Sequence, residues 1–520
     1  MSAAGGGSRV IVVGGGLAGI TAALDCADAG CSVTLLEAKP RLGGLTYSFR
    51  RGDLEVDNGQ HVFLRCCTAY RALLDRLGVA GQTVLQSRLD IPVVSIPDGR
   101  RARLRRSGLP APLHLARSLL TYRPLTVRAR LGAARAVLAL RGVDRTDPAT
   151  DRRSFGDWLR AHGQDAAAVD GLWDLIGVAT LNAHADDASL ALAAMVFQVG
   201  LLERADAADL GWSRVPLGRL HGEAALARLT EAGVTVRTST KVTRLERVGD
   251  QWRVVTSRTG TDVRRAGLDG SHPGGTGSTG RGPDAADWVD AHAPTPRVGG
   301  EERVGRAEDV ADHVILAVPP AAAEALLPAG AVTAAPGWAA RLGAAPIVNV
   351  HVVLSEPVLA EPFLAVVGSP VQWVFDRTQA AGLTSGQYLA VSVSAADPYI
   401  DTPVARLREV FWPELVRVLP AIADVKLVDF FVTRERAATF RPAPGQAALR
   451  LPARTCAPGL VLAGAWTDTG WPATMEGAVR SGHAAARAVL GDRAGHLNGS
   501  GPSAGDQSAS LVPGGRGVMV

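Results

Sequence analysis

Residues 9–44 read RVIVVGGGLAGITAALDCADAGCSVTLLEAKPRLGG, and this stretch decides the fold. The apolar run from Arg9 to Val13 predicts a short buried strand, and an Ala- and Leu-rich helix is expected from Leu17 to about Ala29. Cys31 to Leu36 predicts the next strand. In such a unit the two strands lie parallel and the helix crosses right-handed, so ligands are expected at the carboxyl edge of the strands.

The turn between the first strand and the helix carries a G-x-G-x-x-G motif formed by Gly14, Gly16 and Gly19. The first glycine permits the tight turn, the second lets backbone N–H groups approach a pyrophosphate, and the third lets helix and strand pack closely. Glu37 ends the second strand, where a carboxylate can accept hydrogen bonds from ribose hydroxyls and disfavours a 2′-phosphate. The motif alone is compatible with FAD, with NAD or with a merely similar fold.

The residues that follow indicate a longer cofactor. Glu37 is extended by Arg41, Gly43 and Gly44 in the pattern E-x-x-x-R-x-G-G, a second glycine pair that NAD dehydrogenases do not need. Residues 57–61, Asp-Asn-Gly-Gln-His, form a polar cluster just after a predicted strand, where the chain is expected to return toward the cofactor. A solvated turn is the alternative interpretation of that cluster.

A second stretch near the C-terminus, residues 462–482, reads LAGAWTDTGWPATMEGAVRSG. A strand is expected to end at Gly464, a polar turn follows, and a small-residue helix is expected from near Thr474 to about Leu490. The N-terminus of that helix can direct its unpaired N–H groups and partial positive charge at a flavin carbonyl. The two stretches together predict a two-part site for non-covalently bound FAD.

The rest of the chain divides into helical, β and low-complexity segments. Residues 104–141 and 155–229 are helical in pattern, whereas Val234 to Val255 returns to β character with a hairpin turn at Gly249-Asp250. Thr259 to Asp309 is rich in Gly, Pro, Ser and Thr, which predicts a disordered surface insertion between two neighbouring strands, Trp252–Thr256 and His313–Val318. Residues 491–520 resemble it and predict a disordered tail.

The length and composition limit the kinds of protein to which this chain can belong. The chain has 520 residues, of which 47% are hydrophobic and 20% charged, with a net charge of +5 that comes almost entirely from arginine. This length requires at least two structural regions with their own interiors. The five cysteines lack the paired spacings of a disulfide framework or a zinc site, so we expect a reducing cytoplasm, no metal and no role for the cysteines. No long apolar run or signal peptide predicts membrane insertion or export.

Taken together, these segments resemble the FAD-dependent amine oxidase and phytoene desaturase superfamily. The resemblance is carried by the two glycine-rich stretches, by the strand Val234 to Val242 and by ILAVPP at residues 315–320. Three further segments are similar to the squalene-associated branch, the hydroxysqualene dehydroxylases. They are VDNGQHVFLRC (Val56 to Cys66), LWDLIGVATLNAHADDASLALA (Leu172 to Ala193) and TRERAATFRPAPG (Thr433 to Gly445).

The resemblance implies an α/β fold, in which a Rossmann-like FAD-binding domain of the GR2 type is joined by a second, mixed α+β substrate domain. The implied FAD-binding domain is discontinuous, comprising residues 8–85, 214–258, 309–320 and 455–490, and the substrate and membrane-facing domain comprises 86–213 and 321–454, with the insertion at 259–308 and the tail at 491–520. The implied cofactor-binding residues are Gly14, Gly16, Leu17, Ala18, Gly19, Glu37, Ala38, Arg41, Gly43, Gly44, Gly59, Gln60, His61, Val242, Gly464, Ala465, Ala473, Thr474, Met475 and Ala478. Ala465 stands where many relatives have Asp, and Asp468 is the candidate substitute.

The implied reaction converts hydroxysqualene to squalene, with reduced FAD delivering hydride and water departing. Such a reaction requires an acid, an apolar tunnel and exclusion of water. The candidate acids are His61, Asp57, Asp468 and Glu476, and His61 ranks first because its ordinary pKa lies nearest neutrality.

A C30 substrate implies a peripheral position on the inner face of the cell membrane. The arginine-rich stretch from Arg100 to Arg130 is the candidate interfacial patch, through Leu104, Leu109, Leu113, Leu119 and Leu120. A solvated basic helix with a core face is the alternative interpretation. Squalene-pathway enzymes are possible partners, and no nucleic acid is expected.

Three rival functions share this scaffold. An amine oxidase commonly uses a lysine beside the flavin, and this chain has none between Lys241 and Lys426. A carotenoid or isoprenoid desaturase runs hydride in the opposite direction, which the sequence does not encode. A non-catalytic prenyl-lipid carrier would dispense with the flavin, and the intact glycine motifs argue against it.

Overall fold

The computed structural model describes residues 7–258, 288–290 and 306–497. The N-terminal strand-turn-helix unit forms part of a five-stranded sheet in the order β10-β2-β1-β15-β21, whose neighbouring strands all run parallel. These strands are β1 (Arg9–Val13), β2 (Ser32–Leu36), β10 (Thr235–Arg237), β15 (His313–Leu316) and β21 (Leu460–Leu462). The sequence-based predictions of β1, of β2 and of the following helix α1 (Leu17–Asp28) are confirmed.

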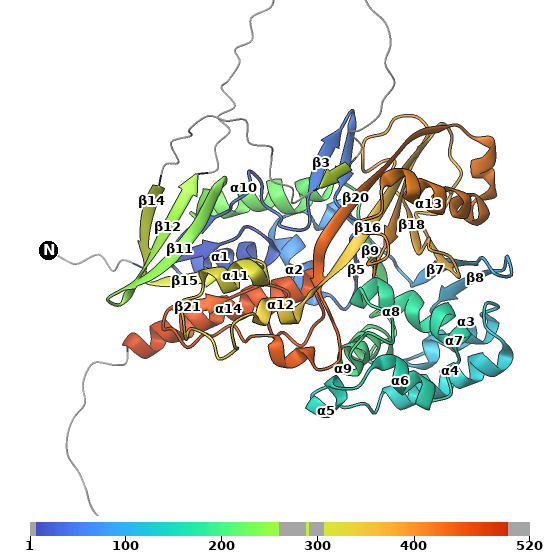
Figure 1. Ribbon diagram of the computed structural model, residues 1–520, viewed down its shortest axis with the longest axis horizontal. Coiled ribbons are helices and arrows are strands. Elements are labelled where there is room, and N and C mark those ends of the chain that lie inside the picture. Colours follow the sequence, from blue (N-terminus) through green and yellow to red (C-terminus); the bar gives the residue numbers. More distant parts are fainter. Residues whose placement is uncertain (1–6, 259–287, 291–305, 498–520) are drawn as a thin grey trace, which may run out of the picture.

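The two glycine-rich stretches come together in space. Strand β21, which leads into Gly464, lies two places from β1 in the parallel sheet. Helix α14 (Met475–Leu497) packs along α1, and Figure 1 shows α14 in red and α1 in blue at the same end of the molecule. Their backbones approach so closely that a Cβ atom on Gly482 would lie 2.4 Å from the carbonyl oxygen of Ala18. The prediction that the early glycine turn and the late segment meet is confirmed.

A three-stranded antiparallel sheet stands beside the parallel one. It contains β11 (Thr240–Val248), β12 (Gln251–Arg258) and β14 (Arg306–Ala311), and β11 and β12 form the hairpin predicted at Gly249-Asp250.

The predicted strand neighbours of the insertion need a correction. The strand that pairs with β12 after the insertion is β14, whereas β15 belongs to the parallel sheet. Charged residues in β14, such as Arg306, Glu308 and Asp309, hide its β pattern because it forms an edge. The predicted disorder is wrong for residues 288–290, which form strand β13, for residues 306–309, which belong to β14, and for residues 491–497, which continue helix α14 (Met475–Leu497). The rest of the predicted insertion and of the predicted tail lies outside the described residues.

An eight-stranded mixed sheet forms the second large body. Its order is β13-β20-β16-β19-β18-β17-β7-β8. The strands are β7 (Asp90–Ser95), β8 (Arg101–Arg105), β13 (Trp288–Asp290), β16 (Ala344–Leu354), β17 (Phe363–Val367), β18 (Trp373–Asp376), β19 (Gln387–Val393) and β20 (Leu427–Phe440). Helix α13 (Val404–Val418) packs its buried residues Leu407, Phe411 and Leu415 into the same apolar core as β16 and β19.

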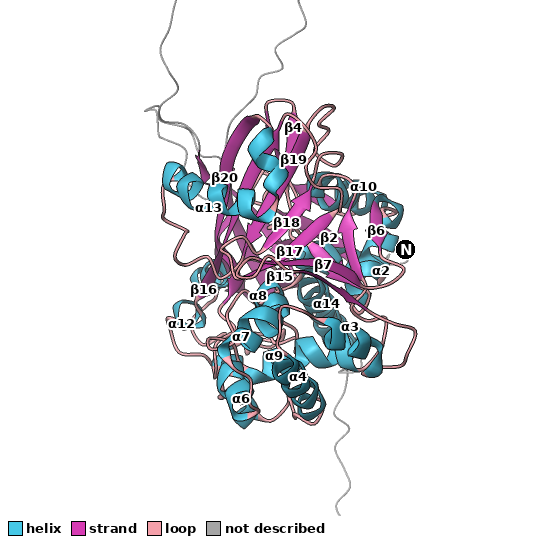
Figure 2. Ribbon diagram, turned by 90° about the vertical axis from the view of Figure 1, so that its right-hand side faces the viewer, coloured by secondary structure: helices cyan, strands magenta, loops and turns pink. Residues whose placement is uncertain are grey.

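A group of helices occupies the end of the molecule below this sheet (Figures 1 and 2). They are α3 (Ala116–Thr121), α4 (Val127–Leu140), α5 (Pro148–Asp151), α6 (Phe155–Ala161), α7 (Ala166–Ala168), α8 (Asp174–Leu181) and α9 (Leu190–Phe197). No helix in the described ranges combines the length and the apolar composition that crossing a membrane requires.

The predicted helical spans contain two exceptions. The first residues of the 104–141 span belong to strand β8, and β9 (Leu210–Ser213) pairs with β5 (Val62–Leu64) and β6 (Thr83–Leu85). The remaining elements are β3 (Ser48–Arg51), β4 (Leu54–Asp57), α2 (Thr68–Arg76), α10 (Ala224–Glu231), α11 (Pro320–Leu326) and α12 (Trp338–Leu342).

A buried ion pair joins the hairpin that follows the glycine turn to the eight-stranded sheet. Asp57 ends β4, and its Oδ2 accepts a hydrogen bond from Nη2 of Arg377 at 2.9 Å. Its Oδ1 accepts from the Ser48 hydroxyl and from the backbone N–H of Leu217. Both side chains of the pair are nearly inaccessible, at 5% for Asp57 and 9% for Arg377. The carboxylate therefore has all its bonds to protein groups.

We predict that Arg377→Met lowers the free energy of unfolding by about 3–5 kcal/mol, because it leaves the Asp57 carboxylate buried without its cation. Urea unfolding followed by circular dichroism measures the change. The matched control is Arg406→Met, which breaks the exposed Arg406–Glu409 pair on α13 and is expected to cost less than about 1 kcal/mol. Equal losses for the two variants would contradict this role for the buried pair.

Candidate cofactor and active site

The glycine turn at the carboxyl end of β1 leaves no room for side chains. Gly14 has φ +109°, and a Cβ atom there would lie 2.3 Å from the carbonyl oxygen of Ala317. The N–H of Gly43 donates to the carbonyl of Gly15 at 2.9 Å, which holds the second glycine pair against the first turn. A Cβ atom on Gly44 would meet the Cα of Gly16 at 2.9 Å. The predicted Gly motifs thus form one continuous backbone surface, which fits a pyrophosphate.

Glu37 lies at the carboxyl end of β2, as predicted. Its Oε2 accepts from the N–H of Gly15 at 2.7 Å, and its Oε1 accepts from the N–H of Lys39 at 2.7 Å. Each carboxylate oxygen has two lone pairs, so each keeps capacity for one more donor. The fixed carboxylate therefore fits the ribose hydroxyls of a dinucleotide beside the glycine turn.

Arg41 supplies a cation to the same surface. Its guanidinium lies 3.4 Å above the centre of the Tyr47 ring and donates to the carbonyl of Gly44 at 3.3 Å. Burial lowers the pKa of Arg41 from its ordinary value, without removing its charge at neutral pH. The donor set at this end of the sheet suits a diphosphate.

The late segment presents one face of α14 toward this turn. Gly464 follows β21, and its N–H donates to the Ser481 hydroxyl at 2.8 Å. Thr474 caps the helix through its hydroxyl, which accepts from the N–H of Gly477 at 3.1 Å. Met475, Ala478 and Gly482 recur at helical spacing, and the last of them lies on Ala18 in the first turn of α1. The helix start therefore lies near the glycine turn, as expected of a flavin-end segment.

Direct contacts of the remaining predicted cofactor residues stay predictions. Val242 lies buried in β11 where the pairing with β12 shifts register. Leu17 and Ala18 are buried in the first turn of α1, and Ala465 and Ala473 lie half-buried in the loop before α14. Ala38 follows Glu37 at the end of β2.

Arg450 organises that loop and was missed by the sequence analysis. Its guanidinium donates to the carbonyls of Thr467 at 2.6 Å and Trp471 at 2.7 Å, and to the Thr469 hydroxyl at 3.2 Å. The side chain is buried, which lowers its pKa to about 10, so that it stays cationic at neutral pH. No pattern in the sequence marks Arg450, because its partners are backbone carbonyls fifteen to twenty-one residues later.

A small cavity lies between the predicted polar cluster and the eight-stranded sheet. It is lined by Asp57, Gln60, His61, Val62, Trp212, Ser213, Leu217, Phe375 and Arg377. The structure thus places Gln60 and His61 in a cleft wall rather than in a solvated turn. Trp212 packs edge-to-face on Phe363, and Phe363 and Phe375 pack against Trp373, which makes the wall around His61 aromatic.

His61 is held in a definite tautomer. Its Nδ1 lies 3.2 Å from the carbonyl oxygen of Gly59, and because a carbonyl only accepts, Nδ1 carries the proton. Burial lowers the pKa of His61 from its ordinary value of 6.5. At neutral pH the ring is therefore mainly uncharged, and Nε2 is an acceptor that donates only after protonation.

The other three candidate acids have different surroundings. Asp57 accepts three hydrogen bonds, from Arg377, from the Ser48 hydroxyl and from the N–H of Leu217. Glu476 is 1% exposed and accepts from the N–H groups of Ala69 and Tyr70, so that it caps α2, and it also pairs with Arg480 at 2.7 Å. Asp468 is exposed in the loop held by Arg450. These contacts favour structural roles for Asp57 and Glu476.

A chain of hydrogen bonds holds the turn that carries His61. The Thr433 hydroxyl and the Asn349 amide both donate to the carbonyl of Asn58, at 3.0 and 3.2 Å. Thr433 in turn accepts from His351, whose other ring nitrogen bonds the Tyr388 hydroxyl at 2.6 Å. Burial lowers the pKa of His351 to about 3, so the ring is neutral in this chain. The face of β16 and β20 that bears these residues therefore faces the turn.

Glu435 lies on that same face and was also missed. Alternate residues of a strand point to the same side, so Glu435 shares its side of β20 with Thr433. The residue is 5% exposed, and its charge acts on Arg41 at the glycine turn. Glu435 stands between Arg434 and Arg436 in TRERAATF, so nothing in the sequence distinguishes it from an exposed charge.

Comparisons with known proteins agree with this geometry. The family model described as flavin containing amine oxidoreductase matches residues 17–267 and 293–490. A protein of Rhodopseudomonas palustris named hydroxysqualene dehydroxylase is 29% identical over 92% of this chain and 98% of its own length. One of the same name from Sinorhizobium fredii is 28% identical over 93% of this chain and 99% of its own. A probable zeta-carotene desaturase of Synechococcus elongatus is 29% identical over 37% of this chain and 42% of its own.

Solved structures share the fold. A double mutant of putrescine oxidase superposes with a TM-score of 0.64 at 19% identity, covering 93% of this chain and 99% of that chain. A putative protoporphyrinogen oxidase from Exiguobacterium superposes with a TM-score of 0.59 at 17% identity, covering 94% and 99%. At these identities the likeness shows the α/β FAD-binding fold, which confirms the predicted fold class.

We predict that Arg450→Lys weakens FAD retention about tenfold or more, because one ammonium group cannot replace the planar donor set that holds residues 465–471. The ratio of flavin to protein absorbance after gel filtration measures retention. Arg441→Lys is the control, since Arg441 is about half exposed and pairs with Asp397 outside the loop. Full retention in Arg450→Lys would contradict the assigned role.

Proposed function

Because the chain belongs to the family of flavin-containing amine oxidoreductases, we propose that it removes the hydroxyl group of hydroxysqualene to give squalene. The chain is an FAD-dependent oxidoreductase, as its family membership shows. The observation that carries the choice of substrate is the extent of the likeness. Relatives named hydroxysqualene dehydroxylase align over 92% to 93% of this chain, whereas the zeta-carotene desaturase of Synechococcus elongatus aligns over 37%.

The proposed reaction has a simple balance. Reduced FAD, when bound, supplies the hydride that forms the new C–H bond and is oxidised as the C–O bond breaks. A proton must reach the departing oxygen, which leaves as water. The residues of this chain have to bind an apolar chain, exclude water and donate that proton.

The cleft beside His61 suits an apolar substrate. Trp212 and Phe375 line it, and Phe363 and Trp373 continue the aromatic wall. These aromatic side chains favour contact with a hydrocarbon, while Asp57, Gln60 and Arg377 supply the polar part of the lining.

The rival reading as an amine oxidase is weakened further by the lysines. Lys39, Lys241 and Lys426 are the only lysines in the sequence, and all three are exposed rather than in the cleft wall. An isoprenoid desaturase remains the second candidate, supported by the partial likeness to zeta-carotene desaturases.

We predict that photoreduced enzyme converts hydroxysqualene to squalene under anaerobic conditions, with one flavin reoxidised per product formed. Gas chromatography of the extracted lipid and the flavin absorbance band measure the two quantities together. Oxidised enzyme incubated with squalene or phytoene is the control for a desaturase. Flavin reduction in that control, with no squalene formed by the reduced enzyme, would replace the proposed reaction by desaturation.

We predict that His61→Gln abolishes turnover while FAD stays bound, and that the wild-type rate falls as pH rises. The rate is expected to fall because burial lowers the pKa of His61, so that the ring loses its proton at a pH below its ordinary pKa of 6.5. Single-turnover rates at several pH values check both points.

Glu435→Gln is the matched comparison for the proton donor. It keeps the shape of a buried residue that shares its side of β20 with Thr433, and it removes the ability of that residue to ionise. If His61→Gln keeps the full rate and Glu435→Gln loses both turnover and the fall of rate with rising pH, the proton donor is Glu435 instead.

A further inference from the structure

An unusual stretch of charge runs through the helical end of the molecule. Between Asp98 and Asp144 the sequence contains no acidic residue, and the same stretch contains eleven arginines. It covers strand β8, helix α3, helix α4 and the loops between them. The positive charge of this stretch is therefore not offset by acidic residues within the stretch.

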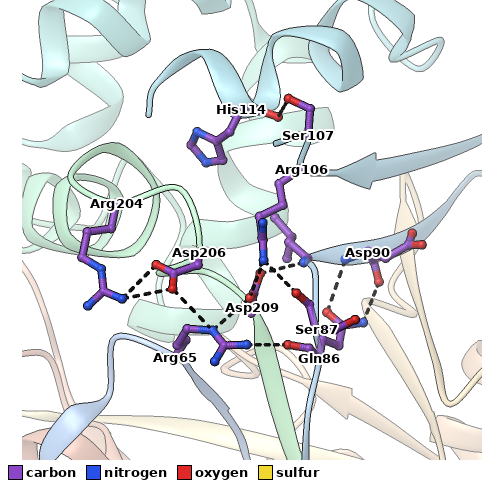
Figure 3. Close-up of polar contacts among 11 residues, drawn as sticks. Arg65, Gln86, Ser87, Asp90, Arg106, Ser107, His114, Arg204, Asp206 and Asp209 are labelled. Atoms are coloured by element: carbon purple, nitrogen blue, oxygen red, sulfur yellow. Dashed lines mark hydrogen bonds and ion pairs between the residues drawn. The ribbon is translucent and has the colours of Figure 1, made fainter. Parts of the chain in front are cut away.

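The first arginines of this stretch form ion pairs with carboxylates of the chain itself. Figure 3 shows Arg106 turned onto Asp209, which accepts from its Nε at 2.6 Å and from Arg65 at 2.9 Å. Arg103 pairs with Asp90 at 2.7 Å. This buried network, centred on a fully inaccessible Asp209, anchors the base of the helical end.

The later arginines have no such partners. Within the ranges 7–258 and 306–497, no carboxylate lies at ion-pair distance from Arg117, Arg123, Arg128, Arg130, Arg135 or Arg141. Their charge is therefore available to something outside the chain.

Helix α4 exposes an apolar stripe in addition to its core face. Val127, Leu131 and Leu138 are 65%, 52% and 60% exposed, and at about 100° per residue they fall within about 40° of one another around the axis. The core-facing residues on the roughly opposite side are Ala133, Ala136 and Leu140. Packing within the chain explains the core face of α4, but it does not explain the exposed apolar stripe.

Arginines flank this stripe on both sides. Arg128 and Arg135 lie about 60–80° to one side of its centre, and Arg130 and Arg141 lie about 60–80° to the other. Three more exposed apolar side chains come from the segment before α4, namely Leu109, Leu113 and Leu120 at 52%, 56% and 62%. We call residues 109–141, with these side chains, the basic apolar surface.

We propose that the basic apolar surface docks on an anionic lipid bilayer. Apolar residues that enter the acyl boundary, flanked by arginines that meet lipid phosphates, are the arrangement of an interfacial helix. A negatively charged surface attracts such a helix, whereas a second copy of this chain would bring like charges together. The proposal rests on these residues and not on the proposed reaction. It adds a site at which the protein contacts the bilayer, in which an apolar substrate would dissolve.

The structure changes the set of leucines that the sequence predicted for the interfacial patch. Leu109, Leu113 and Leu120 are exposed as an interfacial patch requires, whereas Leu104 is 7% exposed and Leu119 packs against the core. Helix α4 beyond Arg130, which that interpretation did not include, supplies the longest stripe.

The test is flotation of the purified holoenzyme with vesicles of phosphatidylcholine alone or with added phosphatidylglycerol. Wild-type protein is expected to float with the anionic vesicles and to be released by salt. The double variant Leu131→Ser and Leu138→Ser is expected to lose most of this binding. Arg128→Gln with Arg135→Gln is expected to weaken it about fivefold per arginine.

Two control variants alter similar residues elsewhere. Leu226→Ser changes a leucine that is 44% exposed on α10, and Arg487→Gln changes an exposed arginine of α14. Both are expected to float like the wild type. All variants should turn over detergent-dispersed substrate normally, so a failure of docking is distinguishable from a failure of the proposed reaction.

Three results would overturn the proposal. Wild-type protein that stays at the bottom of the gradient with anionic vesicles rules out the bilayer. Stripe variants that float like the wild type place the contact elsewhere. A dimer in sedimentation velocity that the stripe variants dissociate, with flotation unchanged, assigns the surface to a second copy of the chain.

Discussion

The contact between helices α1 and α14 is the constraint on which the site depends. At Gly482 the backbone of α14 lies so close to Ala18 that a methyl group would overlap its carbonyl oxygen. This contact fixes α14, about two turns after its start at Met475, beside the first turn of α1, and it thereby sets where the helix start stands relative to the glycine turn that ends β1. A larger residue would push the two halves of the cofactor site apart, so the spacing of small residues in α14 is a requirement of geometry rather than of helix propensity.

Buried polar groups then fix the loops that this contact brings together. Arg450 holds the carbonyls of the loop before α14, and Asp57 and Arg377 hold the hairpin after the glycine turn to the eight-stranded sheet. A buried charge costs free energy unless its hydrogen bonds are complete, and here each charged group has several partners. The loops are therefore held in one arrangement by groups of the protein itself.

The sequence predicted what is determined locally and missed what is determined at long range. The glycine turns, Glu37 and the start of α14 follow from backbone rules that act within a few residues, and the structure has them where they were expected. Arg450 depends on backbone carbonyls of a loop fifteen to twenty-one residues later, and Glu435 acts on Arg41 far along the chain, and no spacing rule marks either residue. Glu476 was expected at the cofactor from its place near the helix start, but its side chain direction is set by α2, an element more than four hundred residues earlier.

The surroundings of His61 bear on the direction of the reaction. Burial beside aromatic side chains disfavours the charged form of His61, and this is why its pKa is lowered. The ring must therefore gain a proton at Nε2 before it can donate one to the departing hydroxyl group. If the chain reduces its substrate, the fraction of molecules with a protonated His61 ring limits the step that removes the hydroxyl group, whereas the neutral ring suits abstraction of a proton in the opposite direction.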